Sequence, residues 1–504
     1  MRQLYLLQSL NIVIEDILDV RQKPENSRKP PKGPSDIVEV LDTKSSLDDH
    51  VDLLNTEPIV LAHDVNFWFF SRPELIPDER GRALPARTDR HISATVFDAV
   101  HFGVKTVAVW DYTFRLVNLL HESPRNSTRV LVLYELSTVC RMEYSRAQAT
   151  FRRAVSVGLG GSRWIQRMST TKKDGSVRTS VKQNIDVLLR TDPQLYYMLQ
   201  LCQDRTTHTQ AALWIQKLED LHRAHPLEKD KLAQHELDTL SDLAVAVTFI
   251  QSLSSLVKLP SMGQKRQGQG FGAECSLLAD RISQLRAGID LGDFAIPIDN
   301  LLQPGRAASA LTKLSEYFIE KLGADINSLY KDLVKPHVAK MQQQQIRDSQ
   351  TDYVTPYIPI SPETSTEQKK DKRKTATGPP IEVPSLESTD TVGTSSEHLV
   401  AKPDAFEVKY DTFAVFSLLL SRPSATRGSI SWHAFTSAMA DLGFSIIPKF
   451  GSIYTFVPPH SVAVQKRLTL HRPRQSNLEQ FHLLSYSRRL KTVYGWGSST
   501  FVRL

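Results

Sequence analysis

Apolar residues recur at helical spacing from about residue 59 onward for almost three hundred residues, and this periodicity narrows the fold class to a helical one. Ser127 and Thr128 can cap a helix whose apolar residues, as far as Phe151, fall near one face. We find no alternating strand patterns over this span. We also find no fixed repeat, which argues against a solenoid. The sequence therefore predicts a large all-α multi-helix domain over residues 59–342.

Polar segments lie on both sides of this domain. Residues 1–58 are rich in proline and charge, and residues 343–405 are poor in apolar side chains. Because such segments cannot bury enough apolar surface to offset the entropy lost on ordering, we expect a mostly disordered N-terminal extension and a disordered linker. The linker contains a basic cluster, Lys369 to Lys374, which is either a solvated linker run or a nuclear-import or nucleic-acid patch.

A second ordered region is expected over residues 406–504, because apolar patterning returns there. Ser431 can cap a helix that Gly443 ends. The residues that follow alternate as a two-stranded ribbon with a turn at 449–452, and then come a third strand and a final helix. The predicted fold is mainly α overall, with a disordered linker joining the all-α domain to a small α+β domain of order α-β-β-β-α.

Positive charge is concentrated at the C-terminal end of the chain. Residues 427–504 hold ten lysines and arginines against Asp441 and Glu479, a net charge of +8, whereas the whole chain carries +7. Such asymmetry favours a polyanion as the partner of that segment alone.

Several other classes of protein are disfavoured by the sequence. The acidic residues near the N-terminus do not suit a signal peptide, and no run of apolar residues is long enough to span a membrane, so we expect a cytoplasmic or nuclear protein with no membrane partner. Cys140, Cys202 and Cys275 are too far apart for a ligand pair and indicate buried thiols in a reducing compartment.

Catalytic and metal-binding motifs give little support for an enzyme in the helical region. The glycines at 158–161 follow a long helix rather than a strand, so they indicate a helix stop and not a phosphate loop. His222, His225 and His235 have no carboxylate or cysteine partners at metal-ligand spacing. We therefore predict no cofactor, no metal site and no catalytic residue.

The C-terminal segment resembles the small HicA-type domain, whose fold is related to that of double-stranded RNA-binding domains. Gly451, Ser452 and Phe456 match the family pattern, but Ile453 stands where the family has the histidine that serves RNA cleavage. An isoleucine cannot take a proton from a ribose hydroxyl, so the resemblance implies RNA binding without this route to cleavage, and an enzyme is the less favoured reading.

A broader resemblance extends from about residue 58 to the end of the chain. Seven separated motifs, among them DVNFWFFSRPE, RTDPQLYYMLQLCQ and LGFSIIPKFGSIYTFVPP, occur in the order found in the fungal "ipa protein" family. This resemblance implies no particular activity, and the first 57 residues lie outside it.

Two main hypotheses follow for an intracellular, non-catalytic protein. In the first, the C-terminal domain binds RNA or another polyanion through phosphates, while the helical domain mediates assembly or binds a protein partner. In the second, the chain is a protein-interaction scaffold without nucleic acid; a cryptic nuclease or other enzyme is a third alternative. The residues predicted to contact nucleic acid are Lys449, Ser452, Lys466, Arg467, His471, Arg472, Arg474, Arg488, Arg489 and Lys491.

Overall fold

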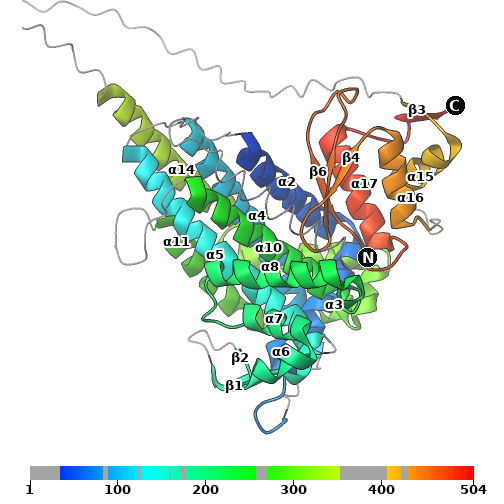
Figure 1. The fold of residues 1–504 in the computed structure, drawn as a ribbon. Coiled ribbons are helices and arrows are strands. Elements are labelled where there is room, and N and C mark those ends of the chain that lie inside the picture. The colour runs from blue at the N-terminus through cyan, green and yellow to red at the C-terminus, as the bar shows by residue number, and fades with distance from the viewer. Residues whose placement is uncertain are drawn as a thin grey trace, which may run out of the picture.

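The structure is a computed structural model that describes residues 34–82, 89–122, 127–158, 160–171, 177–256, 270–351, 406–421 and 429–504. Its larger part is helical, as expected, and its smaller part contains the C-terminal strands (Figure 1). The predicted fold class, a helical domain with a small α+β domain at the C-terminus, is therefore confirmed.

Long helices form the frame of the larger part. They are α2 (Pro34–Thr56), α3 (Pro58–Phe70), α4 (Asp89–Glu122), α5 (Ser127–Val157), α10 (Gln234–Leu256) and α14 (Ile326–Thr351). Shorter helices complete it: α6 (Leu188–Thr191), α7 (Pro193–Leu201), α8 (His208–Ala224), α9 (Pro226–Lys229), α11 (Gly270–Leu285), α12 (Gly292–Ala295) and α13 (Arg306–Leu322). Helix α7 begins as its sequence dictates, because Asp192 accepts a hydrogen bond from the backbone N–H of Leu195 and Pro193 occupies the first turn.

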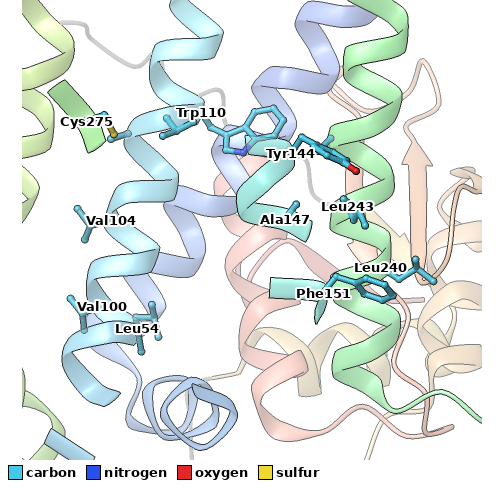
Figure 2. Packing of buried hydrophobic residues seen from close by; sticks show 14 of the residues in the cluster. Leu54, Val100, Val104, Trp110, Tyr144, Ala147, Phe151, Leu240, Leu243 and Cys275 are labelled. Carbon is cyan, nitrogen blue, oxygen red and sulfur yellow. The ribbon is translucent and has the colours of Figure 1, made fainter. Parts of the chain in front are cut away.

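The core of the helical part is built where α4, α5 and α10 meet. Phe151 of α5 and Leu240 of α10 are fully buried, and Figure 2 shows the ring of Phe151 at α10, near Leu240. The stretch His91–Glu122 of α4 is long and apolar enough to cross a membrane, but 78% of its most apolar window is buried inside the protein. Such burial is typical of a core helix.

The boundaries predicted for the helical domain are wrong in two places. Residues 34–56, expected to be disordered, form α2, whose Val40, Leu53 and Leu54 are buried in the core. Residues 343–351, expected to belong to the linker, extend α14. The linker residues 352–405 lie outside the described part of the chain, as do residues 1–33.

The helical domain also contains a β-hairpin that was not predicted. Strands β1 (Ile165–Thr171) and β2 (Val177–Val181) pair antiparallel, with Ile165 opposite Val181. The register shifts between Arg167 and Thr171. Polar residues dominate both strands, so the hairpin lacks the alternation of apolar and polar residues that would reveal a half-buried strand.

The C-terminal domain contains the predicted α-β-β-β-α core and additional elements around it. Its helices are α15 (Tyr410–Leu420), α16 (Trp432–Asp441) and α17 (Gln480–Tyr494). Strands β4 (Ser445–Pro448), β5 (Ile453–Val457) and β6 (Leu468–His471) form an antiparallel sheet in that order, and β3 (Phe406–Val408) pairs in parallel with β7 (Phe501–Arg503). Ser431 caps α16 as predicted, and Gly443 after that helix has φ +87°.

Each domain has its own hydrophobic core. Phe416, Phe435 and Phe456 are fully buried within the C-terminal domain. Leu484 of α17 is an exception, because it belongs to the core of the helical domain. Figure 1 shows the consequence, with α17 lying beside α2 where the two domains meet.

Candidate anion-binding surface at the domain interface

Arg489 of α17 is the most deeply buried charge on the surface predicted to bind nucleic acid. Its side chain is only 2% exposed, and its guanidinium group contacts α2. One guanidinium nitrogen lies 2.5 Å from Asp42 Oδ1, and the other lies 2.9 Å from Asp49 Oδ2 and 2.8 Å from Ser45 Oγ. Arg489 is therefore held by two carboxylates of the helical domain.

Neighbouring donors of the C-terminal domain bind the same face of α2. Arg488 pairs with Asp52 and lies 3.4 Å from Asp49, which also accepts a 2.7 Å hydrogen bond from Thr492. Burial raises the pKa of Asp42, while Arg489 and hydrogen bonds from the backbone and side chain of Thr469 on β6 oppose that rise. The C-terminal domain thus surrounds carboxylates with arginine, hydroxyl and backbone donors.

A second polar contact joins the turn after β4 to helix α10. Ser452 is 1% exposed, donates a 2.9 Å hydrogen bond to Asp238 and lies 2.8 Å from Nδ1 of His471. Asp238 and Asp242 raise the pKa of His471 to about 9, although burial opposes this rise. At neutral pH His471 is therefore a cation between two aspartates.

This serine, histidine and aspartate arrangement is unsuited to nucleophilic catalysis. A catalytic histidine must be neutral to take the proton of the serine, whereas His471 already carries its proton. The Ser452 hydroxyl is directed to Asp238 and is buried from any substrate. The arrangement is that of a docking contact. Ile453 is also buried, directly opposite His471 in the β5–β6 pairing.

Close backbone approach fixes the turn that carries Ser452. Gly451 has φ +59°, and a Cβ atom there would lie 2.2 Å from the hydroxyl of Ser241. Its carbonyl accepts a 2.6 Å hydrogen bond from Lys229. Position 451 therefore requires glycine, because other residues rarely adopt this φ and their Cβ atom would clash with α10.

Apolar and aromatic contacts complete the interface. Leu484 and the partly buried Phe450 and Phe481 pack against the core of the helical domain. The ring of Phe481 stacks on His63 of α3 with 3.9 Å between centroids. The two domains are therefore joined by both charged and apolar contacts.

The predicted nucleic-acid residues consequently fall into two groups. Ser452, His471, Arg488 and Arg489 are engaged by the helical domain. The side chains of the second group remain exposed, although the backbone N–H of Arg474 donates a 2.5 Å hydrogen bond to Gln234 of α10; the group consists of Lys449, Lys466, Arg467, Arg472, Arg474 and Lys491. Within the described residues, no carboxylate lies at ion-pair distance from Lys466, Arg467 or Arg472, nor from Arg474 or Lys491.

The acidic partners on α2 were missed by the sequence reasoning. Asp42, Asp49 and Asp52 are spaced seven and three residues apart, which places them on one helix face with Ser45. This spacing indicates a common face only if the segment is a helix, whereas its composition predicts disorder.

Other candidates behave as structural residues. Cys140, Cys202 and Cys275 are buried free thiols, as predicted. The glycines follow the end of α5, as expected for a helix stop, and His222 hydrogen-bonds Gln194 at 2.7 Å. No cluster of potential metal ligands occurs in the parts of the chain that the structure covers. The basic cluster at 369–374 lies outside them.

No protein-family model matches this chain, and no curated protein or solved structure matches it either.

Proposed function

We propose that this protein binds RNA or a similar polyanion through the phosphates, without cleaving it, and that the contact is made by the exposed cations of the C-terminal domain. One observation carries the proposal most directly. Lys466, Arg467, Arg472 and Lys491 are exposed and lack carboxylate partners among the described residues, and the exposed side chain of Arg474 interacts with Glu236 without an ion pair at contact distance. Cations left unpaired on a domain with such excess positive charge favour phosphate binding.

The arrangement around β6 suits a backbone contact better than sequence-specific recognition. Lys466 and Arg467 precede β6, whereas Arg472 and Arg474 follow it, so cations lie at both ends of one strand. Phosphates repeated along a nucleic acid can contact both ends, and such binding is led by shape and sensitive to salt.

The test is a titration of the full-length protein with duplex RNA at a low and a high salt concentration. We expect Lys466→Glu, Arg467→Glu, Arg472→Glu and Arg474→Glu combined to weaken binding about a hundredfold or more at low salt, because several phosphate contacts are lost. A control with two charge reversals on the helical domain, Arg281→Glu with Lys331→Glu, should have little effect, since both residues are exposed and distant in sequence from the basic segment. The pair Arg472→Glu with Arg474→Glu is the variant of equal charge and should weaken binding more than this control.

The competing function is a protein-interaction scaffold. The binding of α2 aspartates by Arg488 and Arg489 favours it, because it shows that this surface accepts acidic helices. Absence of RNA binding at low salt, or binding that ignores salt, would refute the polyanion proposal and leave the scaffold.

A further inference from the structure

We infer that α2 acts as an internal pseudo-ligand, whose carboxylates occupy part of the polyanion-binding surface and so limit binding until the C-terminal domain undocks. This inference concerns the regulation of the surface described above and rests on the proposed function. It predicts a closed state, in which only the exposed cations bind phosphate, and an open state in which Arg488 and Arg489 also bind it.

The carboxylates of α2 occupy the positions that phosphate oxygens would take. Asp42 and Asp49 receive charge-assisted hydrogen bonds from Arg489, and Asp49 receives another from Thr492. Arginine forks, threonine hydroxyls and backbone N–H groups are the donors that bind phosphate as readily as carboxylate. The α2 surface therefore competes for the same donors.

The contact with α10 also places carboxylates of the helical domain against a cation of the C-terminal domain. His471 lies 3.3 Å from Asp238 and 3.6 Å from Asp242, so a third predicted RNA contact is also neutralised by the helical domain. Acidic residues from two separate helices thus cover three cations of the C-terminal domain, Arg488, Arg489 and His471. A polyanion must take the place of these carboxylates to bind the three cations, because a buried charge requires a partner.

Undocking is compatible with the way the two domains are built. The C-terminal domain has its own core, so it can move as a folded unit. Helix α2 stays behind, because Leu53 and Leu54 anchor it in the core of the helical domain. A buried ion pair adds little net stability after the cost of desolvation, so a polyanion that supplies replacement charges can compete with it.

The first experiment compares RNA affinity in closed and opened proteins. Asp42→Asn, Asp49→Asn and Asp52→Asn combined should bind duplex RNA at least tenfold more tightly than wild type at low salt. The salt dependence should become steeper by about two, one unit for each released arginine. Adding Arg488→Glu and Arg489→Glu to the triple variant should remove the gain.

A charge-matched control separates undocking from a general change in net charge. Asp220→Asn, Asp280→Asn and Asp332→Asn alter the charge equally, but at exposed positions that contact no residue of the C-terminal domain. Affinity should change little in this control. An equal gain in both triple variants would overturn the inference.

The second experiment observes undocking directly. A protease site placed within residues 352–405 of the full chain allows the two domains to be separated after folding. Size-exclusion chromatography should show co-elution of the cleaved parts in low salt, and separation when excess duplex RNA is added or when the α2 triple variant is used.

Three outcomes distinguish the two claims. RNA that binds the cleaved complex without releasing its parts, with unchanged affinity in the α2 variant, overturns the pseudo-ligand role and leaves RNA binding intact. Failure of every variant to bind RNA refutes the proposed function itself, and the inference with it. Release by RNA together with tighter binding of the α2 variant supports both.

Discussion

At the scale of single residues, burial decides what a cation on this protein can do. Arg489 and Arg467 look equivalent in the sequence, yet Arg489 is buried between aspartates while Arg467 is exposed. A buried charge without partners would cost several kcal/mol, so Arg489 requires its carboxylates in the docked state. Exposed arginines have no such requirement and remain available for ligands.

The titration of His471 gives a prediction at this scale. Its pKa is raised from 6.5 to about 9, so its contribution to docking is complete below about pH 6.5 and is lost as the pH rises through 9. The pKa of Asp238 is lowered, so the contribution of this carboxylate to docking persists until the pH falls below the usual range of aspartate pKa values. The thermal midpoint of the wild type should therefore fall between pH 7 and pH 10.

The control for this titration is His471→Gln, which can still hydrogen-bond but carries no charge. The lysines and tyrosines that also titrate at high pH are common to both proteins. The difference between their melting curves should shrink as the pH rises through 9. A constant difference over this range would contradict the assignment of a charged His471.

At the scale of the element, packing of helix faces explains most of the fold. Helix α5 presents Val132, Leu136, Val139 and Phe151 to the core, and all four are fully buried. Their spacing is the periodicity by which the sequence predicted this helix. Thr128 at its start is bound by Asp348 of α14, a tertiary contact that no local pattern indicates.

Truncation of the α5 face should be costly. Phe151→Ala removes a fully buried ring from the contact with α10, and we expect a loss of about 3–5 kcal/mol in the free energy of unfolding. Chemical denaturation monitored by circular dichroism measures this loss. Phe70→Ala is the matched control, since Phe70 is 54% exposed and should cost far less. Equal losses of unfolding free energy in the two variants would contradict the prediction that the Phe151 ring is the more buried one.

At the scale of the whole molecule, the two domains form separate cores joined by one mixed interface. Leu484 belongs to α17 but packs in the core of the helical domain, so it serves docking rather than folding of its own domain. The charged contacts of Arg488 and Arg489 come from the same helix. Docking and folding can therefore be separated by mutation.

Leu484→Asp should undock the domains without unfolding either of them. The new carboxylate would be buried in the apolar core of the helical domain without a partner, which disfavours the docked state. We expect calorimetry to resolve two unfolding transitions, one for each domain, which overlap more in the wild type. The near-ultraviolet circular dichroism signal of the folded protein should be retained. Leu418→Asp is the control, because Leu418 is 37% exposed on α15. A single unchanged transition in Leu484→Asp would contradict this role of Leu484.

Elements whose local pattern agrees with their tertiary surroundings can be predicted without the structure. Periodicity and turn residues predict helices α5, α7, α8, α10 and α13, most of α14, the cap at Ser431 and the order α16, β4, β5, β6, α17. They do not predict the short helices α6, α9 and α12. Charge counting also located the basic domain, because net charge depends on composition and not on folding.

The accessibility of those basic residues, in contrast, depends on contacts between segments that are distant in the sequence. The α2 segment reads as disordered because its apolar residues are few, and it is helical because α4 supplies the surface on which they pack. Once α2 is ordered, its aspartates face Arg488 and Arg489 across more than four hundred residues of sequence. Local patterns cannot report such a contact, since its energy depends on two distant segments being brought together by separate cores.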